Sequence, residues 1–359
     1  METKKYKLTD KTIEHNGHIL HRIEALKDFG DVKKGDLGGW VQSEDNLSQD
    51  DRCWIFDEAK VYDIAIVSGS AEVKGNAEVY GNVEICGYAH IFGAAEVYGL
   101  SRIMGNAKIF GTSKIYGSAN IYDNAEIFND AKISGHTKIY GNAEVYGNAH
   151  VWGNAEVYGY AEVNGNSIIR DNAKIYEDAK IYEDAKIYSK AEVYGCSLVR
   201  GEARVYNNAK IFGKAIIEEQ AKVYGNSEIY DNAYISGEAN IYASAKIFGC
   251  TKVFGKAIIH GVASLNKGVF GGAFGDDLNI VENKNVLLTT NLEINNFTVI
   301  VSKIKEDLLS EMIETIEIRT NIVDVDYLSF LIKKQHNWKD TPVLLEFVKN
   351  NDLFEEYII

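Results

Sequence analysis

Histidine is the side chain in this sequence best suited to move a proton near neutral pH, because its ordinary pKa lies close to 6.5. Four histidines stand inside a long run of similar short segments, and His90, His136 and His150 are the three considered as catalytic candidates; the fourth is His260. A general base needs a second group to orient it and a pocket to hold its substrate. The three histidines stand at irregular intervals and among different neighbours, so we keep them as catalytic candidates only for an alternative function.

Other catalytic and metal-binding patterns do not occur in the sequence. The glycines of the repeated segments stand singly, the sequence has no phosphate-binding GxGxxG, and there is no nucleophile elbow. Cys53, Cys86, Cys196 and Cys250 lie far apart with no CxxC pair, which argues against a disulfide framework and a zinc site. We therefore expect no metal and no cofactor, and the sequence favours a protein that is not an enzyme.

Charge and hydropathy limit the classes of partner. The net charge is −14, made up of −2 over residues 1–52, −5 over 53–265 and −7 over 266–359. This distribution shows no basic stripe of the kind that nucleic-acid binders carry, so we expect no nucleic-acid partner. No apolar run is long enough to cross a membrane, and the first ten residues lack the apolar core of a signal peptide. We expect a cytoplasmic protein without a membrane partner.

A six-residue period dominates the chain from residue 53 to residue 265. Every sixth residue from Ile55 to Leu265 is Ile, Val or Leu, over 36 positions without an insertion. A small residue, mostly alanine, stands two places before each of them, as Ala143 does before Val145. A small residue, then any residue, then an aliphatic residue is the pattern of a short strand whose first and third side chains share one face. The sequence predicts a repetitive β-structure with these two side chains inside.

Each six-residue segment ends in a residue suited to a tight corner. Glycine stands two places after the aliphatic in 23 of the 36 segments, and Asp or Asn in seven more. These residue types tolerate positive φ better than others do. In the stretch NAKIYEDAKIYEDAKIYSKAEVYG, residues 172–195, Glu177, Glu183 and Ser189 stand there instead. Either the positive φ moves one residue on, to Asp178 and Asp184, or these corners are strained by about 1 kcal/mol each.

Segments such as Ile139-Tyr140-Gly141-Asn142-Ala143-Glu144 resemble those of the hexapeptide-repeat, left-handed parallel β-helix superfamily. In that superfamily three hexapeptides form one triangular coil of 18 residues. The resemblance implies an all-β solenoid of about 12 coils, roughly 57 Å long at the usual strand spacing. With its ends, the predicted fold is a left-handed parallel β-helix with a small N-terminal cap and a C-terminal α+β module.

An 18-residue coil makes a prediction that the sequence itself supports. Residues 18 apart should be stacked neighbours, and charges of opposite sign alternate down one such series. That series is Lys138, Glu156, Lys174, Glu192, Lys210, Glu228 and Lys246.

The residue after the aliphatic is aromatic in 24 of the 36 segments, whereas the superfamily favours small or acidic residues there. At an 18-residue step one column is Tyr122, Tyr140, Tyr158, Tyr176, Tyr194, Phe212, Tyr230 and Phe248. Tyr182 and Tyr188 extend the tyrosine set around residues 172–195. Rings on successive strands stabilise one another by roughly 0.2–1 kcal/mol per pair. They also form a surface that could bind a protein, a glycan or a nucleotide, so both interpretations stay open.

The two ends depart from the repeat, and open solenoid ends need covering. Gly38-Gly39-Trp40-Val41, Asn46-Leu47-Ser48 and Cys53-Trp54-Ile55 resemble the leading segment of YdcK-type acyltransferases and of related phage-encoded repeat proteins. We expect Trp40 and Trp54 to cap the first coil. The domains are then a cap at 1–52, the β-helix at 53–265, a glycine-rich linker at 266–277 and an α+β module at 278–359. We place a helix from about Ser302, with Ile304, Leu308, Met312 and Ile316 on one face, and a last helix from Thr341-Pro342 to about Asn350.

These observations favour a non-catalytic structural, interaction or assembly protein, of the kind that a phage or prophage encodes. We expect a homo-oligomer, of which a trimer is one form, with a protein or small-molecule partner at the aromatic face or the C-terminal module. The first alternative, implied by the superfamily, is an acyltransferase that uses acyl-CoA and His90, His136 or His150 at a trimer interface. A glycan- or nucleotide-binding surface is the second alternative.

Overall fold

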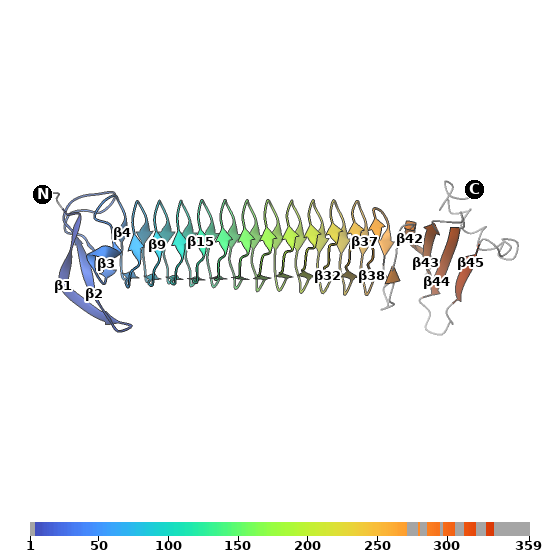
Figure 1. Cartoon of the computed structure of the whole chain (residues 1–359), viewed down its shortest axis with the longest axis horizontal. Coiled ribbons are helices and arrows are strands. Elements are labelled where there is room, and N and C mark those ends of the chain that lie inside the picture. The colour runs from blue at the N-terminus through green and yellow to red at the C-terminus, as the bar shows by residue number, and fades with distance from the viewer. Residues whose placement is uncertain are drawn as a thin grey trace.

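The structure is a computed structural model that describes residues 4–270 and five later strands, at 279–280, 286–294, 297–305, 312–320 and 328–333. Residues 53–265 wind into a parallel β-solenoid, seen as a rod of stacked coils in Figure 1. Each coil has three two-residue strands, and each strand pairs in parallel with the strand 18 residues on, as Lys138 does with Glu156. The predicted triangular β-helix is confirmed.

The three sides of the rod are named here after their first strands in the regular coil. The β4 face consists of β4 (Trp54–Ile55), β7 (Glu72–Val73), β10 (His90–Ile91), β13 (Lys108–Ile109), β16 (Glu126–Ile127), β19 (Glu144–Val145), β22 (Glu162–Val163), β25 (Lys180–Ile181), β28 (Leu198–Val199), β31 (Ile216–Ile217), β34 (Tyr234–Ile235), β37 (Lys252–Val253) and β40 (Val269–Phe270).

The β5 face consists of β5 (Lys60–Val61), β8 (Glu78–Val79), β11 (Glu96–Val97), β14 (Lys114–Ile115), β17 (Lys132–Ile133), β20 (His150–Val151), β23 (Ile168–Ile169), β26 (Lys186–Ile187), β29 (Arg204–Val205), β32 (Lys222–Val223), β35 (Asn240–Ile241) and β38 (Ile258–Ile259).

The β6 face consists of β6 (Ile66–Val67), β9 (Glu84–Ile85), β12 (Arg102–Ile103), β15 (Asn120–Ile121), β18 (Lys138–Ile139), β21 (Glu156–Val157), β24 (Lys174–Ile175), β27 (Glu192–Val193), β30 (Lys210–Ile211), β33 (Glu228–Ile229), β36 (Lys246–Ile247) and β39 (Ser264–Leu265).

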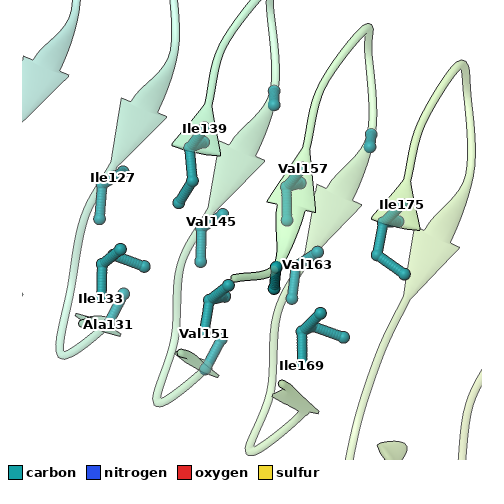
Figure 2. Packing of buried hydrophobic residues seen from close by; sticks show 14 of the residues in the cluster. Ile127, Ala131, Ile133, Ile139, Val145, Val151, Val157, Val163, Ile169 and Ile175 are labelled. Carbon is teal, nitrogen blue, oxygen red and sulfur yellow. The ribbon is translucent and has the colours of Figure 1, made fainter. Parts of the chain in front are cut away.

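The interior of the rod is a continuous core of alanine and branched aliphatic side chains. Figure 2 shows Ile127, Ile133 and Ile139 pointing inward from the three sides of one coil. These residues and the small residues two places before them, Ala125, Ala131 and Thr137, are fully buried. The tightly packed interior leaves little room for larger side chains at the small position, which explains why alanine predominates there.

The corners hold the residues that the period predicts. Residues two places after the aliphatic have positive φ, including Glu177 at 58°, Glu183 at 60° and Ser189 at 62°. The second of the two alternatives is therefore correct, and the positive φ does not move on to Asp178 or Asp184. A left-handed non-glycine residue costs roughly 1–2 kcal/mol. The glutamates regain part of this cost, because Glu177 Oε2 accepts a hydrogen bond from Gly195 N at 2.8 Å and Glu183 Oε2 accepts one from Gly201 N at 2.8 Å.

The N-terminal residues form a hairpin that joins the solenoid. Strands β1 (Tyr6–His15) and β2 (His18–Ala25) are antiparallel, and the turn residues Asn16 and Gly17 both have positive φ. Strand β3 (Leu37–Val41) pairs with β2 and, in parallel, with β5. A 3-10 turn, η1 (Glu44–Asn46), follows, and Leu47 bridges to Val67. These contacts continue two sides of the rod before residue 53.

Both tryptophans expected at the cap are buried beside this hairpin. Trp54 is 1% exposed and lies edge-on to Tyr6 and Phe29, with ring centroids 6.0 and 5.3 Å away. Trp40 is 3% exposed, packs with Leu20 and Tyr62, and donates its indole N–H to Glu58 at 2.8 Å.

The C-terminal strands form an antiparallel sheet, β42 (Val286–Ile294), β43 (Phe297–Lys305), β44 (Met312–Thr320) and β45 (Leu328–Lys333), while β41 (Asn279–Ile280) pairs with β38. The helix predicted from about Ser302 is wrong, because Ser302 to Lys305 and Met312 to Thr320 are strands. Alternation in ETIEIRT, residues 314–320, and the branched residues of FTVIVS outweigh the helical spacing of Ile304, Leu308, Met312 and Ile316. The last predicted helix and residues 271–277 of the expected linker lie outside the described residues.

Candidate functional site

The outer surface of the rod consists of columns, because every outward position recurs at an 18-residue step. Each face carries one column from its strands and, beside it, one column from the residues that follow the aliphatic. The second kind contains the predicted aromatic series, and its stacking is confirmed. On the β6 face the rings from Tyr122 to Phe248 lie 4.7–4.9 Å apart between centroids, with planes within 6° of parallel.

Two further aromatic columns have the same geometry. The β5 face carries Tyr62, Tyr80, Tyr98 and Tyr116, then Tyr188, Tyr206, Tyr224 and Tyr242, with His260 stacked on the last ring. The β4 face carries Phe92, Phe110, Phe128 and Tyr146. In all three columns the ring faces cover one another. What the columns offer to a partner is ring edges and phenol hydroxyls.

Burial and neighbouring carboxylates raise the pKa of many of these phenols. Desolvation, with the Tyr140 and Glu156 charges nearby, raises the pKa of Tyr158 to about 12. Desolvation also raises the pKa of Tyr206 to about 12. The hydroxyls are therefore protonated at neutral pH, and they can donate hydrogen bonds.

Tyr182 and Tyr188, predicted in the binding set, lie on different faces. Tyr182 is on the β4 face, where its hydroxyl donates to the Glu162 carboxylate. Tyr188 is the first ring of the second tyrosine run on the β5 face, and the Arg170 guanidinium lies 4.4 Å from its ring centroid. The near-identical hexapeptides of residues 172–195 thus carry their tyrosines around all three sides of the rod.

The strand columns differ in charge from face to face. On the β6 face the predicted alternating series is confirmed as cross-strand pairs, with ion pairs between Lys138 and Glu156 at 3.2 Å and between Lys246 and Glu228 at 3.0 Å. On the β4 face Lys108 pairs with Glu126 and Lys180 with Glu162, each at 2.8 Å. Between those two glutamates lies Glu144, whose pKa is raised by burial and then by the neighbouring Glu162 and Glu126.

The β5 face has a basic segment that the sequence analysis missed. Lys186, Arg204 and Lys222 pair with one another on the adjacent strands β26, β29 and β32. None of the three forms an ion pair in the described chain, whereas Lys60 and Lys114 of the same face pair with Glu78 and Glu96. Net charges summed over whole segments hid this column; sorting the outward strand residues at the 18-residue step would have found it.

The three candidate histidines are not brought together. His90 lies on the β4 face, with Nδ1 3.0 Å from the Glu72 carboxylate. His136 occupies an exposed corner. His150 lies on the β5 face beside Trp152, at 4.3 Å between ring centroids, and burial followed by the Lys132 charge lowers its pKa. Each histidine therefore has its own surroundings, and His90 alone has a carboxylate to orient it.

The described residues contain no group of three or more His, Cys, Asp or Glu side chains placed to hold a metal ion. Within the same part of the chain, none of the helical segments has the length and apolar character to cross a bilayer.

Comparison with known proteins gives one short similarity. The chain matches no protein-family model. A stretch of 40 residues is 45% identical to part of the uncharacterized acetyltransferase YdcK of Escherichia coli strain K12. It covers 11% of this chain and 12% of YdcK. A match of this extent, together with the parallel β-solenoid, is compatible with the β-helix superfamily to which the repeat was compared.

Proposed function

We propose that the chain is a non-catalytic rod that acts as an interaction and assembly protein, and that it associates with itself through the β6 face. The observation that carries the proposal is the composition of that face: an unbroken aromatic column beside a strand column of alternating charge. The solenoid supports both columns without an inserted loop between residues 53 and 265.

The alternating column is complementary to a copy of itself. Lys174, Glu192 and Lys210 follow one another at one strand spacing, about 4.8 Å. A second rod shifted by one coil therefore places each lysine opposite a glutamate. Ring edges from Tyr140, Tyr158 and the rest of the column would lie against the neighbouring rod, where they would bury apolar surface and their hydroxyls could donate hydrogen bonds to it.

The test is the oligomeric state of the whole chain, measured by light scattering over a range of concentrations. Together, Tyr140→Ser, Tyr158→Ser and Tyr176→Ser should shift the protein toward the monomer. Phe92→Ser, Phe110→Ser and Phe128→Ser remove as many stacked rings from the β4 face and should leave the oligomer intact. A monomer at every concentration, unchanged by the first set, would refute self-association through this face.

The second candidate function is acyl transfer from acyl-CoA, and two observations favour it. These are the similarity to a protein named as an acetyltransferase and the pair formed by His90 and Glu72. A carboxylate on one imidazole nitrogen leaves the other free to accept a proton. Calorimetry with acetyl-CoA should then show binding, and a His90→Asn variant should lose transfer. No heat with any acyl-CoA would count against this candidate.

The binding of neutral glycans or nucleotides through ring stacking has less support. Stacking needs an open ring face, and within the stacked runs both faces of each inner ring are taken by neighbouring rings. A glycan array or a nucleotide screen tests this second alternative directly.

A further inference from the structure

The basic segment of the β5 face places like charges side by side, so its presence needs an explanation. Like charges on directly adjacent strands destabilise a sheet. Lys186, Arg204 and Lys222 are such neighbours, about 4.8 Å apart at the strand spacing. Among the cations in the strands of residues 53–265, those without an ion pair are Lys132, Lys186, Arg204 and Lys222 on the β5 face and Lys252 on the β4 face. The unpaired cations thus gather on one side of the rod.

The segment is accessible and narrow. Arg204 and Lys222 are exposed and Lys186 is half-buried. Carboxylates border the column at the corner that precedes it, at Glu183, Asp184, Glu202 and Glu219, without forming ion pairs with it. Two of them, Glu183 and Glu219, bind the amides of Gly201 and Gly237 in the next coil at 2.8 and 2.6 Å. The positive charge therefore forms a line along the rod, which suits a linear partner better than a flat anionic surface such as a membrane.

Hydroxyl groups lie beside the cations. Tyr188, Tyr206 and Tyr224 form the neighbouring column, with their rings stacked and their edges outward. Arg170, which also pairs with Asp171 at 3.2 Å, covers the outer ring face of Tyr188. A ligand along this face would meet a cation and a phenol hydroxyl in each coil. That combination matches a polymer whose every unit carries an acidic group and hydroxyl groups.

We propose that the segment formed by Lys186, Arg204 and Lys222, with the tyrosines beside them, binds a linear anionic polysaccharide that lies parallel to the rod axis. This inference rests on the proposed role as an interaction protein and adds a ligand on a face that self-association does not use. Carboxylate or sulfate groups would contact the cations, and sugar hydroxyls would bond to the phenols.

Other polyanions fit this surface less well. An acidic peptide in an extended conformation presents side chains on one face every two residues, about 6.6 Å apart, out of step with the coils. Single-stranded nucleic acid gains much of its affinity by stacking bases on aromatic faces, and those faces are covered here. Duplex nucleic acid carries its phosphates on a helical path. That path would curve away from the flat face of the rod after a short contact.

The experiment is binding of the full chain to polygalacturonate and to dextran sulfate, followed by biolayer interferometry at low and physiological ionic strength. Neutral dextran, polyglutamate and a poly-dT oligonucleotide are the comparison polymers. We expect binding to one or both anionic polysaccharides that weakens with salt. The variant with Lys186→Gln, Arg204→Gln and Lys222→Gln should bind at least about tenfold more weakly, a loss expected from removing several charge contacts at once.

A matched variant separates this effect from net charge. Lys108→Gln, Lys180→Gln and Lys252→Gln remove the same charge from the β4 face, which takes no part in the proposed self-association, and should keep polysaccharide affinity. The β5 variant should melt no lower than the parent chain, because it relieves repulsion, so lost binding would not reflect unfolding. Equal loss in both variants, or preferred binding of poly-dT or polyglutamate, would overturn the proposal. So would binding of none of the polymers by a chain that still self-associates through the β6 face, a result that leaves the proposed function standing.

Discussion

Ring stacking within the β6 column predicts an energetic coupling between neighbouring tyrosines. Tyr140 and Tyr158 lie 4.8 Å apart between ring centroids, with planes 2° from parallel. Tyr122 lies on the other side of Tyr140, at 4.8 Å, so it contacts Tyr140 but is two coils away from Tyr158. Leucine at these positions keeps apolar bulk and removes the ring. The pairs Tyr140/Tyr158 and Tyr122/Tyr158 therefore form a test and its control.

The expected magnitude follows from the number of stacked neighbours each ring has. Aromatic pairs contribute about 0.5–1.5 kcal/mol beyond the area they bury. Each single variant loses the contact between the two rings, so the sum of the two single effects counts that contact twice. The double variant Tyr140→Leu/Tyr158→Leu loses it only once. The coupling between the two substitutions should therefore be about 0.5–1.5 kcal/mol. Tyr122→Leu and Tyr158→Leu share no contact and should be additive to within about 0.5 kcal/mol.

Equilibrium urea unfolding, followed by far-UV circular dichroism, measures the free energies of unfolding for the parent, three single and two double variants. The slope of each transition must stay constant across the set, since a changed slope would mean that part of the solenoid unfolds separately. If the adjacent pair is as additive as the separated pair, the rings do not stabilise one another, and the structural explanation for the column fails.

Three further outcomes follow from the pKa shifts and the corners. Burial raises the pKa of Tyr158 and Tyr206 to about 12 from 10, so the folded chain favours the protonated phenol. The contribution of these phenols to the free energy of unfolding is complete below pH 10 and should be lost between pH 10 and about 12. Urea midpoints measured across that range would show the loss. Glu177→Asp should raise the free energy of unfolding by a few tenths of a kcal/mol, because aspartate tolerates positive φ better, whereas Glu177→Ala should lower it by about 1 kcal/mol through loss of the bond to Gly195 N; equal stability of the two variants would contradict the role of the carboxylate. Glu144→Lys should stabilise the rod by about 0.5–1 kcal/mol, because it turns three stacked glutamates into an alternating series, and a lower melting temperature would contradict that reasoning.

Much of the rod could be predicted because its period leaves little freedom. Ala143 and Val145 specify the inside of a strand, Gly147 specifies a corner, and an 18-residue step brings Lys138 to Glu156. The same step could have shown Lys186, Arg204 and Lys222 as neighbours. Their alignment is apparent only when the outward strand residues of all three faces are sorted at that step.

Other features needed coordinates. The sequence does not reveal that tyrosine ring faces cover one another, since side-chain orientation depends on rotamers and packing. At the N-terminus, Trp40 pairs with Lys60 across a 20-residue step, before the 18-residue step begins with Trp54 and Glu72. Near Ser302 the sequence carried both a helical and a strand pattern, and the strand pattern was the correct one.

The uniform interior has a consequence for how the chain finds its fold. Every hexapeptide presents the same small and aliphatic pair inward, so a coil that loops out one hexapeptide would still bury a well-formed core (Figure 2). Such a slip rotates all later residues by one face. It would place Asn164 rather than Tyr158 next to Tyr140, and the charge series from Lys138 would continue through Glu162 and Lys180 and then end at the uncharged Leu198. The outward columns therefore select one winding among several that the core cannot distinguish. The surface of this rod specifies its fold as much as the interior does.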